Sequence, residues 1–314
     1  MGATRAPEPA ARPAAAEAGH APSQGSALGL LAVSVVLFGT AWPVMKVGVQ
    51  EMTPLWFAAA RLGLGALAAF LLLFCLGRFR LPGRADLPIV LSIGTCQLAL
   101  FIGLGNVALQ FVPAGRTVVL AYTTSLWLVP LALLTGERIG ARRLGGVGLG
   151  LAGVVVLMNP AALDWSDPDM VAGHLILLLA ALGWALAIFH ARRHRWHLSP
   201  LQVLPWQMLW AAALLTPAAL VFEPGGGVAG TASALAILVY LGVFAGPVAS
   251  WAATSVARAL PTVVSSVGFL GVPAVGLLVS AAWLGEPVTP ALGAGAVLVL
   301  VGLLLVALGA ARGR

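Results

Sequence analysis

The sequence predicts an all-α polytopic membrane protein with about ten transmembrane helices arranged as two five-helix inverted repeats. The first observation is composition: 60% of the 314 residues are hydrophobic, 9% are charged, and the mean hydropathy is +1.01, whereas roughly 25% of the residues of an ordinary soluble domain are charged. The second is that landmarks of the first half recur in the second. The third is that each half holds an odd number of apolar segments, so the second half must enter the bilayer from the opposite side.

The internal repeat is marked by a proline that starts an apolar run and a glutamate that ends it. Pro113 and Pro261 begin the two runs, 148 positions apart (261 minus 113). Glu137 and Glu286 end them, in the tetrapeptides Leu-Thr-Gly-Glu and Trp-Leu-Gly-Glu, 149 positions apart (286 minus 137). Landmarks that recur at nearly one offset indicate an internal duplication. Inverted repeats with an interface near the membrane midplane are typical of carriers.

Ten apolar segments are long enough to cross the hydrocarbon core as helices that satisfy their own backbone hydrogen bonds. They are residues 28–46, 55–77, 87–109, 114–135, 143–159, 173–191, 201–222, 233–256, 261–284 and 289–310, of which the first and the fifth are short. The boundaries that follow are a cytoplasmic tail over 1–26, a first repeat over 28–159, a linker over 160–172 and a second repeat over 173–310. The tail is rich in Ala, Pro, Gly and Glu, which predicts disorder, and it lacks the apolar centre of a signal peptide.

Charge is distributed unevenly between the two sides of the predicted bundle. Outside the tail, the arginines of alternate loops and of the C-terminus fall on the side of the N-terminus, namely Arg78, Arg80, Arg84, Arg138, Arg142, Arg143, Arg192, Arg193, Arg195, Arg258, Arg312 and Arg314. The opposite loops hold Lys46 and Arg116 as their only bases. The positive-inside rule therefore predicts a multi-pass protein of the cell membrane with both termini cytoplasmic. The same distribution argues against a nucleic-acid partner, despite a formal net charge of +7.

Sequence motifs of catalysis and metal binding are absent. There is no His-Glu-x-x-His, no Gly-x-Ser-x-Gly and no phosphate-binding glycine loop, so we expect neither an enzyme nor a primary pump, and no cofactor. His190, His194 and His197 share a helical spacing, but the arginines among them repel a cation, so a solvated basic loop is favoured over a metal site. Cys75 and Cys96 fall inside spans, which excludes a disulfide framework.

Glycines of the fifth and tenth spans predict close helix packing. Gly146 and Gly150 form a small-xxx-small pair in the fifth span, and Gly293 and Gly295 occupy the matching place in the tenth. The pattern favours packing within one chain, and it leaves open a homodimer through the same two spans.

Arg61 is the sharpest candidate for a binding residue. It lies about six residues inside the second span, where a guanidinium costs several kcal/mol unless it faces water or a partner. One interpretation is an arginine that snorkels to the interface. The other is a charge that lines a central cavity and is available to an anionic or carboxylate-bearing substrate. Lys46, at the end of the first span, is either a second charge of that cavity or an interfacial anchor.

Other polar and aromatic residues at mid-depth complete the predicted substrate site. The polar patch of the fourth span has its counterpart in the ninth, where glycines and Pro273 are expected to loosen the helix. The predicted substrate-binding residues are Trp42, Arg61, Gln97, Asn106, Tyr122, Thr124, Trp184, Trp210, Trp251 and Ser265. The structural alternatives are an interfacial aromatic belt for the tryptophans and hydroxyls bonded to their own helix for the serine and threonine.

Together these stretches resemble the drug/metabolite transporter superfamily in its EamA-domain branch. The resemblance covers about 28–310 as two EamA-type repeats, and it is carried by residues 37–42 (Leu-Phe-Gly-Thr-Ala-Trp), by Thr53-Pro54 through Arg61-Leu62, by 134–139 followed by Leu144-Gly145, and by 283–289 followed by Leu292-Gly293. It implies a ten-helix inverted-repeat carrier of the cytoplasmic membrane that exports metabolites, amino acids or toxic compounds by alternating access.

The expected function is a secondary active transporter that exports a small organic metabolite, amino acid or amphipathic compound, with membrane lipid around it. Two alternatives stay open. One is an intramembrane lipid-handling flippase or enzyme, in which Arg61 would hold an anionic headgroup, and the other is a passive channel. The sequence leaves the substrate, the coupling ion, the transport direction and the oligomeric state undetermined.

Overall fold

The computed structural model describes residues 24–137, 139–158 and 166–311, and every regular element within them is a helix. The predicted tail lies outside the described residues apart from its end, where the first helix already begins, and only the part of the predicted linker from residue 166 onward is described.

The first half contains five membrane-crossing rods. They are α1 (Gln24–Glu51), α2 (Pro54–Cys75), a third rod of α3 (Leu87–Ser92), the π-helical η1 (Ile93–Leu100) and α4 (Phe101–Ala108), a fourth rod of α5 (Ala114–Ala121) and α6 (Thr124–Leu134), and α7 (Ala141–Met158). The second half repeats this order. It consists of α8 (Pro168–Arg193), α9 (Pro200–Phe222), a third rod of α10 (Ala232–Val239), the π-helical η2 (Tyr240–Val248) and α11 (Ala249–Ala259), a fourth rod of α12 (Thr262–Phe269) and α13 (Gly271–Leu284), and α14 (Pro290–Ala311).

The prediction of about ten transmembrane helices is confirmed. Among the described residues, nine helical rods are long and apolar enough to cross a membrane. The tenth rod is α7, which is 18 residues long and carries Arg142 and Arg143 in its first turn. The helix ends differ from the predicted segments at two places. α1 has 28 residues and is not a short span, and α8 starts at Pro168, inside the predicted linker of residues 160–172.

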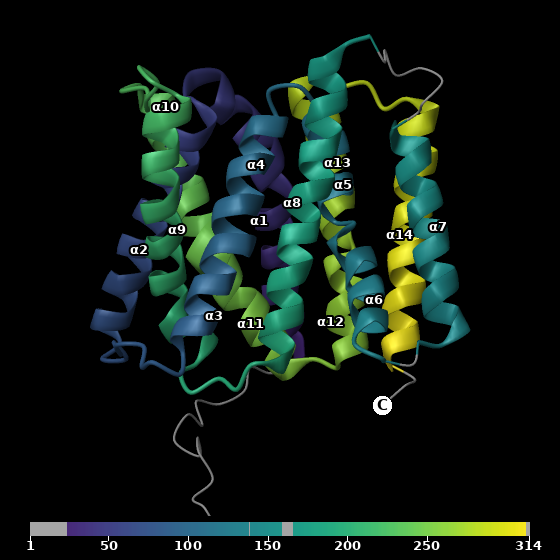
Figure 1. Cartoon of the computed structure of the whole chain (residues 1–314), viewed down its shortest axis with the longest axis horizontal. Helices are drawn as coiled ribbons and strands as arrows, with labels where there is room; N and C mark the ends of the chain where they lie inside the picture. Colours follow the sequence, from purple (N-terminus) through teal and green to yellow (C-terminus); the bar gives the residue numbers. More distant parts are fainter. Residues whose placement is uncertain (1–23, 138, 159–165, 312–314) are drawn as a thin grey trace, which may run out of the picture.

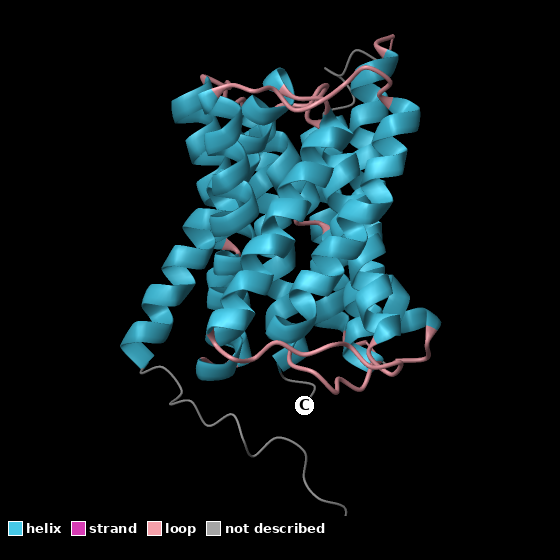
Figure 2. Cartoon of the chain, turned by 90° about the vertical axis from the view of Figure 1, so that its left-hand side faces the viewer, coloured by secondary structure: helices cyan, strands magenta, loops and turns pink. Residues whose placement is uncertain are grey.

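The two halves run through the bundle in opposite directions. Figure 1 shows α1 starting at the lower edge of the bundle, whereas α8, the first helix of the second half, starts at the upper edge and descends. α14 ends at the lower edge, so both ends of the described chain lie on one side, as the even number of spans requires. Figure 2 shows loops gathered at the two edges, with short interruptions of the helices between them.

The halves interlock, because most of the tight packing joins a helix of one half to a helix of the other. The second helices, α2 and α9, pack together, and so do the last helices, α7 and α14. The first helix of each half is inserted into the other half: α1 packs against α11 and α13, and α8 packs against α4 and α6. This pattern maps onto itself when the halves are exchanged, as expected for inverted repeats.

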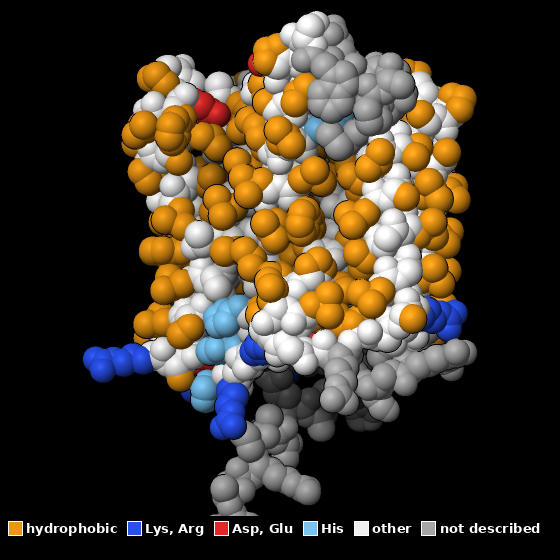
Figure 3. All heavy atoms as spheres, turned by 45° about the vertical axis from the view of Figure 1, so that its right-hand side comes forward, with side chains coloured by type: hydrophobic (Ala, Val, Ile, Leu, Met, Phe, Trp, Pro, Cys, Tyr) orange, Lys and Arg blue, Asp and Glu red, His pale blue; other side chains and the backbone are white. Residues whose placement is uncertain are grey.

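Glycines allow α7 and α14 to come into backbone contact. A Cβ atom on Gly146 would lie 2.8 Å from the carbonyl oxygen of Gly302, and one on Gly153 would lie 2.9 Å from that of Gly295. The glycine face of α7 thus packs within the chain, as the small-residue pattern favoured, while the homodimer stays a prediction. The outer surface is apolar, with Leu134 and Phe222 largely exposed, and Figure 3 shows hydrophobic side chains covering its middle and basic ones along its lower edge.

Candidate functional site

Breaks in the helices mark the middle of the bundle. The fourth span is interrupted between α5 and α6, and the ninth between α12 and α13. The interrupted rods begin 148 positions apart (262 minus 114), which is the offset of the two prolines in the sequence. Discontinuous helices near the midplane expose backbone polar groups and form the substrate and ion sites of many inverted-repeat carriers.

Hydroxyl groups bond to backbone carbonyls at these breaks. The Oγ1 atom of Thr123 donates to the Leu120 oxygen at 2.6 Å, and that of Thr124 donates to the Ala121 oxygen at 2.8 Å. In the ninth span, the Ser265 hydroxyl donates to the Pro261 oxygen at 3.3 Å. Thr124 and Ser265 therefore make the bonds to their own helix that were the structural alternative to a substrate role.

The third and eighth spans each contain a π-helical segment at the corresponding place, η1 and η2. Segments of this kind recur at functional sites because the extra residue per turn displaces side chains and carbonyls from the regular helix pattern. Gly94 in η1 and Gly242 in η2 let the other half approach. A Cβ atom on either would lie 2.9 Å from a carbonyl oxygen, that of Gln207 for Gly94 and that of Arg61 for Gly242.

Three aromatic rings connect the halves beside these segments. The Phe101 ring stands edge-on to Trp42, with ring centroids 5.8 Å apart, and to Trp184, with centroids 4.2 Å apart. The three residues come from α1, α4 and α8. The structure therefore brings the predicted residues Trp42 and Trp184 together around Phe101, which sequence reasoning missed because a phenylalanine in an apolar span carries no signal of its own.

A second contact between the halves involves one of the two tyrosines of the chain. The hydroxyls of Thr40 in α1 and Tyr240 at the start of η2 are hydrogen-bonded at 2.5 Å. The other tyrosine, Tyr122, packs half-buried against the main hydrophobic core at the break of the fourth span. Gln97 is half-buried in η1.

Arg61 is buried in α2 and does not snorkel. Its side chain is 7% exposed, and its buried Nη1 atom has no hydrogen-bond partner among the described residues. Asn106 is fully buried; its amide nitrogen donates to the Pro54 oxygen at 3.0 Å, while its Oδ1 atom has no described partner. Buried polar atoms without partners are rare in native proteins and indicate a ligand, an ion or water.

Gln207 is the counterpart of Arg61 in the second half. The helix starts Thr53-Pro54 and Ser199-Pro200 are 146 positions apart (199 minus 53), the same separation as Arg61 and Gln207. Gln207 is 4% exposed, and its Nε2 atom has no described partner. Sequence reasoning missed it because a neutral amide in a span attracts less notice than a charge, although the offset was available.

Lys46 binds the end of a neighbouring helix, and its two predicted roles, cavity charge and interfacial anchor, stay predictions. Its ammonium donates to the carbonyl oxygens of Leu109, at 2.5 Å, and Val112, at 3.3 Å. These oxygens follow the end of α4, where the carbonyls have no partner within the helix, and a cation there also complements the helix dipole. Lys46 thus caps a neighbouring helix of its own half.

Trp210 and Trp251 are set apart from the aromatic cluster. Trp210 is 37% exposed, and its indole nitrogen donates to the Thr95 hydroxyl at 3.0 Å. Trp251 is 45% exposed on α11. Neither makes a ring contact with Trp42, Phe101 or Trp184 among the described residues.

Acidic side chains at the upper edge bind helix starts of the opposite half. Glu223 accepts the backbone N–H groups of Leu55 and Trp56 in the first turn of α2, at 2.8 and 3.2 Å. Glu286 accepts those of Ala114 and Gly115 in the first turn of α5, at 2.7 and 2.8 Å. The Glu286 carboxylate thus reaches across to the other half, and both of its described hydrogen bonds are made with α5.

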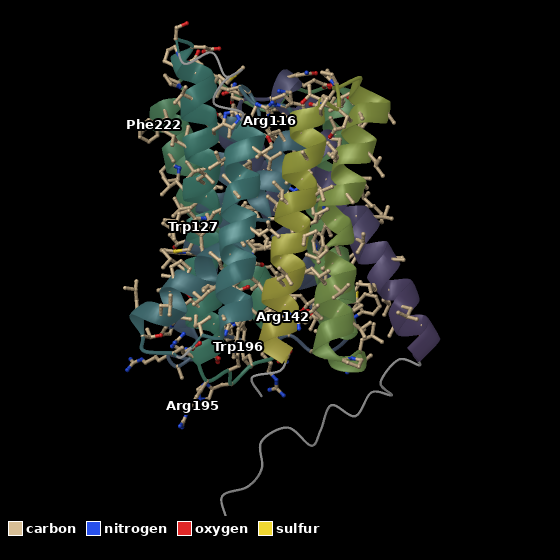
Figure 4. All side chains as sticks on the ribbon, turned by 90° about the vertical axis from the view of Figure 1, so that its right-hand side faces the viewer. Arg116, Trp127, Arg142, Arg195, Trp196 and Phe222 are labelled. Carbon is tan, nitrogen blue, oxygen red and sulfur yellow. The ribbon has the colours of Figure 1, made fainter. Side chains whose placement is uncertain are left out.

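Two further polar contacts hold the upper edge. The Glu51 carboxylate accepts the hydroxyls of Thr231 and Ser233, at 2.7 and 2.6 Å. Arg116, near the upper end of the bundle in Figure 4, has its guanidinium 3.3 Å from the ring of the buried His174. A pocket of about 410 Å³ opens beside Glu51 and the loop at 225–229, and it contains no residue of the predicted substrate site.

At the lower edge, histidines take part in ordinary polar contacts. His190 lies 2.6 Å from the Ser92 hydroxyl, and the His197 ring lies 3.7 Å from the carboxylate of Asp86. In the part of the chain that the structure describes, no group of three or more His, Cys, Asp or Glu side chains is arranged to hold a metal. Arg195 projects from this edge in Figure 4.

Two interlocked halves of opposite direction, with broken helices at mid-depth, define the class of inverted-repeat membrane transporters. Comparison with known families identifies the branch: the profile of the EamA-like transporter family matches residues 25–159 and again 171–308. The chain therefore belongs to the EamA-like transporter family, in two repeats.

Relatives named as transporters or exporters agree with this assignment. The chain is 30% identical over 284 residues to a protein of Salmonella typhimurium named a probable amino-acid metabolite efflux pump (86% of this chain, 90% of that protein). It is 28% identical to the uncharacterized transporter YvbV of Bacillus subtilis (88% and 90%) and 26% identical to a probable terminal-alkyne amino-acid exporter of Streptantibioticus cattleyicolor (88% and 91%). A solved crystal structure shares the fold, with a TM-score of 0.65 at 24% identity over 91% of this chain and 97% of that one.

Proposed function

We propose that this protein exports a small amphipathic metabolite bearing a carboxylate, such as an amino-acid derivative, by alternating access. The single observation that supports this substrate class is Arg61, a buried guanidinium whose Nη1 atom has no described partner. A carboxylate is the ligand that a guanidinium binds most strongly, by paired charge-assisted hydrogen bonds. Relatives named as amino-acid metabolite or amino-acid exporters support the same class.

The apolar part of the substrate is assigned to the aromatic cluster. Trp42, Phe101 and Trp184 meet at the interface of the halves, and aromatic faces offer a large rigid surface for an apolar group. Gln207, as the neutral counterpart of Arg61, supplies a second donor for an uncharged acceptor of the substrate. Because Arg61 is charged and Gln207 is neutral, the two residues give the substrate a preferred orientation along the membrane normal.

The lower edge in Figure 1 is assigned to the cytoplasm of a cell-membrane protein. Arg142 and Arg195 lie at this edge in Figure 4, and Arg78 follows the lower end of α2. Glu51, Glu223 and Glu286 make their contacts at the upper edge. Arginine-rich loops are retained on the cytoplasmic side during insertion. Export then means movement from the lower edge to the upper edge, driven by an ion or substrate gradient.

The test is transport in proteoliposomes against a panel of amino acids, acylated amino acids and their neutral amides, with and without an imposed pH gradient. We expect saturable uptake and counterflow of a carboxylate compound. The Arg61→Gln variant should lose transport of that compound by about tenfold or more, since a hydrogen bond to a charged group contributes roughly 1.5–3 kcal/mol, while transport of its amide changes little. Arg78→Gln, at an exposed arginine, is the matched control.

Three outcomes would refute the proposal. Equal losses for carboxylate and amide would show that Arg61 is structural. Flux without saturation or counterflow would indicate a channel, and movement of labelled phospholipid between leaflets, sensitive to Arg61→Gln, would indicate a flippase.

A further inference from the structure

The two halves of the molecule are related in sequence but differ at their ends. At the upper edge, α5 packs against α13 and α1. If each helix is replaced by its counterpart in the other half, these contacts become contacts of α12 with α6 and α8 at the lower edge. The described residues show no comparable packing there. The contact of α12 with α1 corresponds to that of α5 with α8, whereas the contact of α12 with α14 has no counterpart of similar extent at the upper edge. The upper end of the interface is therefore closed, and the lower end is not.

The helix starts show the same difference in exposure. Val264, in the first turn of α12, is 42% exposed, whereas its equivalent 148 positions earlier, Arg116 in the first turn of α5, is half-buried. The two residues occupy the first turns of rods that begin at equivalent positions after Pro113 and Pro261. The start of α12 is thus less enclosed by protein than the start of α5, although Ser265, like its equivalent Thr117, is buried.

Glu286 is the central contact of the closed end. The chain turns sharply at Gly285, whose φ is +68°, and the following carboxylate accepts both amide N–H groups at the start of α5. These amides have no partner within their own helix, and the helix dipole favours a negative charge beside them. Gly115 permits the approach, because a Cβ atom there would lie 3.3 Å from the Glu286 Oε2 atom. We call Glu286 with the amides of Ala114 and Gly115 the upper latch.

Glu137 follows the same kind of turn at the lower end. Gly136 has a φ of +78°, and Glu137 comes next, as Glu286 follows Gly285. Its carboxylate is half exposed (50%) and lies 3.2 Å from the guanidinium of Arg193, which is stacked on the Phe189 ring at 3.7 Å. Beside Glu137 the structure has a pocket of about 180 Å³, lined by residues of α6, α7 and α8.

The walls of this pocket correspond to the neighbours of α5. At the upper edge α5 contacts α13, α14 and α1, and the exchange of halves turns these helices into α6, α7 and α8. The pocket is therefore the place that the start of α12 would take if the lower end closed as the upper end has.

We propose that Glu286 and Glu137 are alternating latches. In the state described here, Glu286 holds the start of α5 and closes the upper end. In the opposite state, Glu286 is released, and Glu137 holds the start of α12 in the pocket between α6, α7 and α8. This inference rests on the proposed alternating access. It adds two carboxylates, those of Glu286 and Glu137, whose contacts distinguish the two states of the transporter. A group stabilises one state over the other only through contacts that differ between them. Glu286 makes such a contact in this structure, and the proposal gives Glu137 the equivalent contact in the opposite state.

The experiment measures accessibility and needs no substrate. In a Cys75→Ser/Cys96→Ser background, single cysteines replace Val118 in α5, which is buried against Gly276 of α13, or its counterpart Ser266 in α12, which is half-buried. Membrane-impermeant thiol reagents are applied to oriented vesicles from the upper or the lower side. We expect the cysteine at 118 to be protected from the upper side and the cysteine at 266 to react from the lower side.

Glu286→Gln should raise the reaction rate at position 118 from the upper side about tenfold, since the loss of a charge-assisted contact made in one state shifts the ratio of states by that order. The rate at position 266 from the lower side should fall. Glu137→Gln should leave position 118 protected. The matched control is Glu223→Gln, because the described hydrogen bonds of the Glu223 carboxylate are made at the same edge with the start of α2, which is an uninterrupted helix.

The latch would be overturned if the cysteine at position 118 reacted at the same rate in Glu286→Gln and Glu223→Gln, or if neither substitution changed that rate. If Glu286→Gln fails to reach the membrane, Gly115→Ala decides the question. Its Cβ atom would lie 2.9 Å from Leu277 and displace the latch without removing the carboxylate. If the cysteine at position 118 stayed protected in that variant, the proposal would also be refuted. Failure of carboxylate transport in proteoliposomes leaves the labelling result unaffected, so the two proposals fail separately.

Discussion

The contact between α7 and α14 gives a stability prediction that can be worked from distances. In Gly302→Ala the new Cβ atom would lie 2.6 Å from the Gly146 oxygen and 2.6 Å from the Gly150 nitrogen. Ordinary contact begins at 3.4 Å, so the helices must separate by about 0.8 Å (3.4 minus 2.6). Because the atoms on the other side are backbone, no side-chain rotation can relieve the overlap.

The cost of such overpacking is about 1–3 kcal/mol. Gly148→Ala in α7 is the matched control, since a Cβ atom there would have no neighbour within 4 Å. Both variants gain the helix propensity of alanine, roughly 1 kcal/mol, so the difference between them isolates the packing cost. We expect Gly302→Ala to unfold at a Tm several degrees below that of Gly148→Ala.

The assay is thermal unfolding in detergent, followed by tryptophan fluorescence and by size-exclusion chromatography. Equal Tm values for the two variants would refute the reasoning, because the α7–α14 contact would then have to be loose. A loss of a dimer peak in Gly148→Ala alone would instead show that the other face of α7 binds a second copy.

Two further predictions concern polar contacts inside the bundle. Lys46→Met should destabilise the protein by about 1.5–3 kcal/mol, because the oxygens of Leu109 and Val112 lose a charged donor. The loss is measured by thermal unfolding, with Arg84→Gln, at an exposed site, as the control. An unchanged Tm would contradict the capping role. In a double-mutant cycle, Thr40→Val and Tyr240→Phe should show a coupling of about 0.5–1.5 kcal/mol, since both remove the same hydrogen bond; additive effects would mean that the bond does not contribute.

The fold was predictable from the sequence because it depends on local signals. Apolar length defined the rods, and the offset between Pro113 and Pro261 defined the repeat. The polar patch at Tyr122 and the glycines before Pro273 fell where the fourth and ninth spans are interrupted. The π-helical segments were not foreseen, because a single inserted hydrogen-bond register leaves little trace in hydropathy.

The contacts of the site were harder to predict, because they join residues far apart in the chain. Lys46 reaches the end of α4, and Glu286 reaches α5 in the other half. Hydropathy places such residues at a depth but does not give their neighbours across the interface. The counterpart Gln207 could have been found by applying the 146-residue offset to Arg61, and this is the one site residue that closer use of the sequence would have added.

The exchange of partners between the halves has a consequence for biogenesis. Because α2 pairs with α9 and α7 pairs with α14, the first five helices leave the ribosome before the surfaces that complete them have been synthesised. Until α14 has been synthesised, the glycine face of α7 lies in the translocon or in lipid without its packing partner. Synthesis of α14, and not of the first repeat, is then the step at which this bundle can complete its native packing.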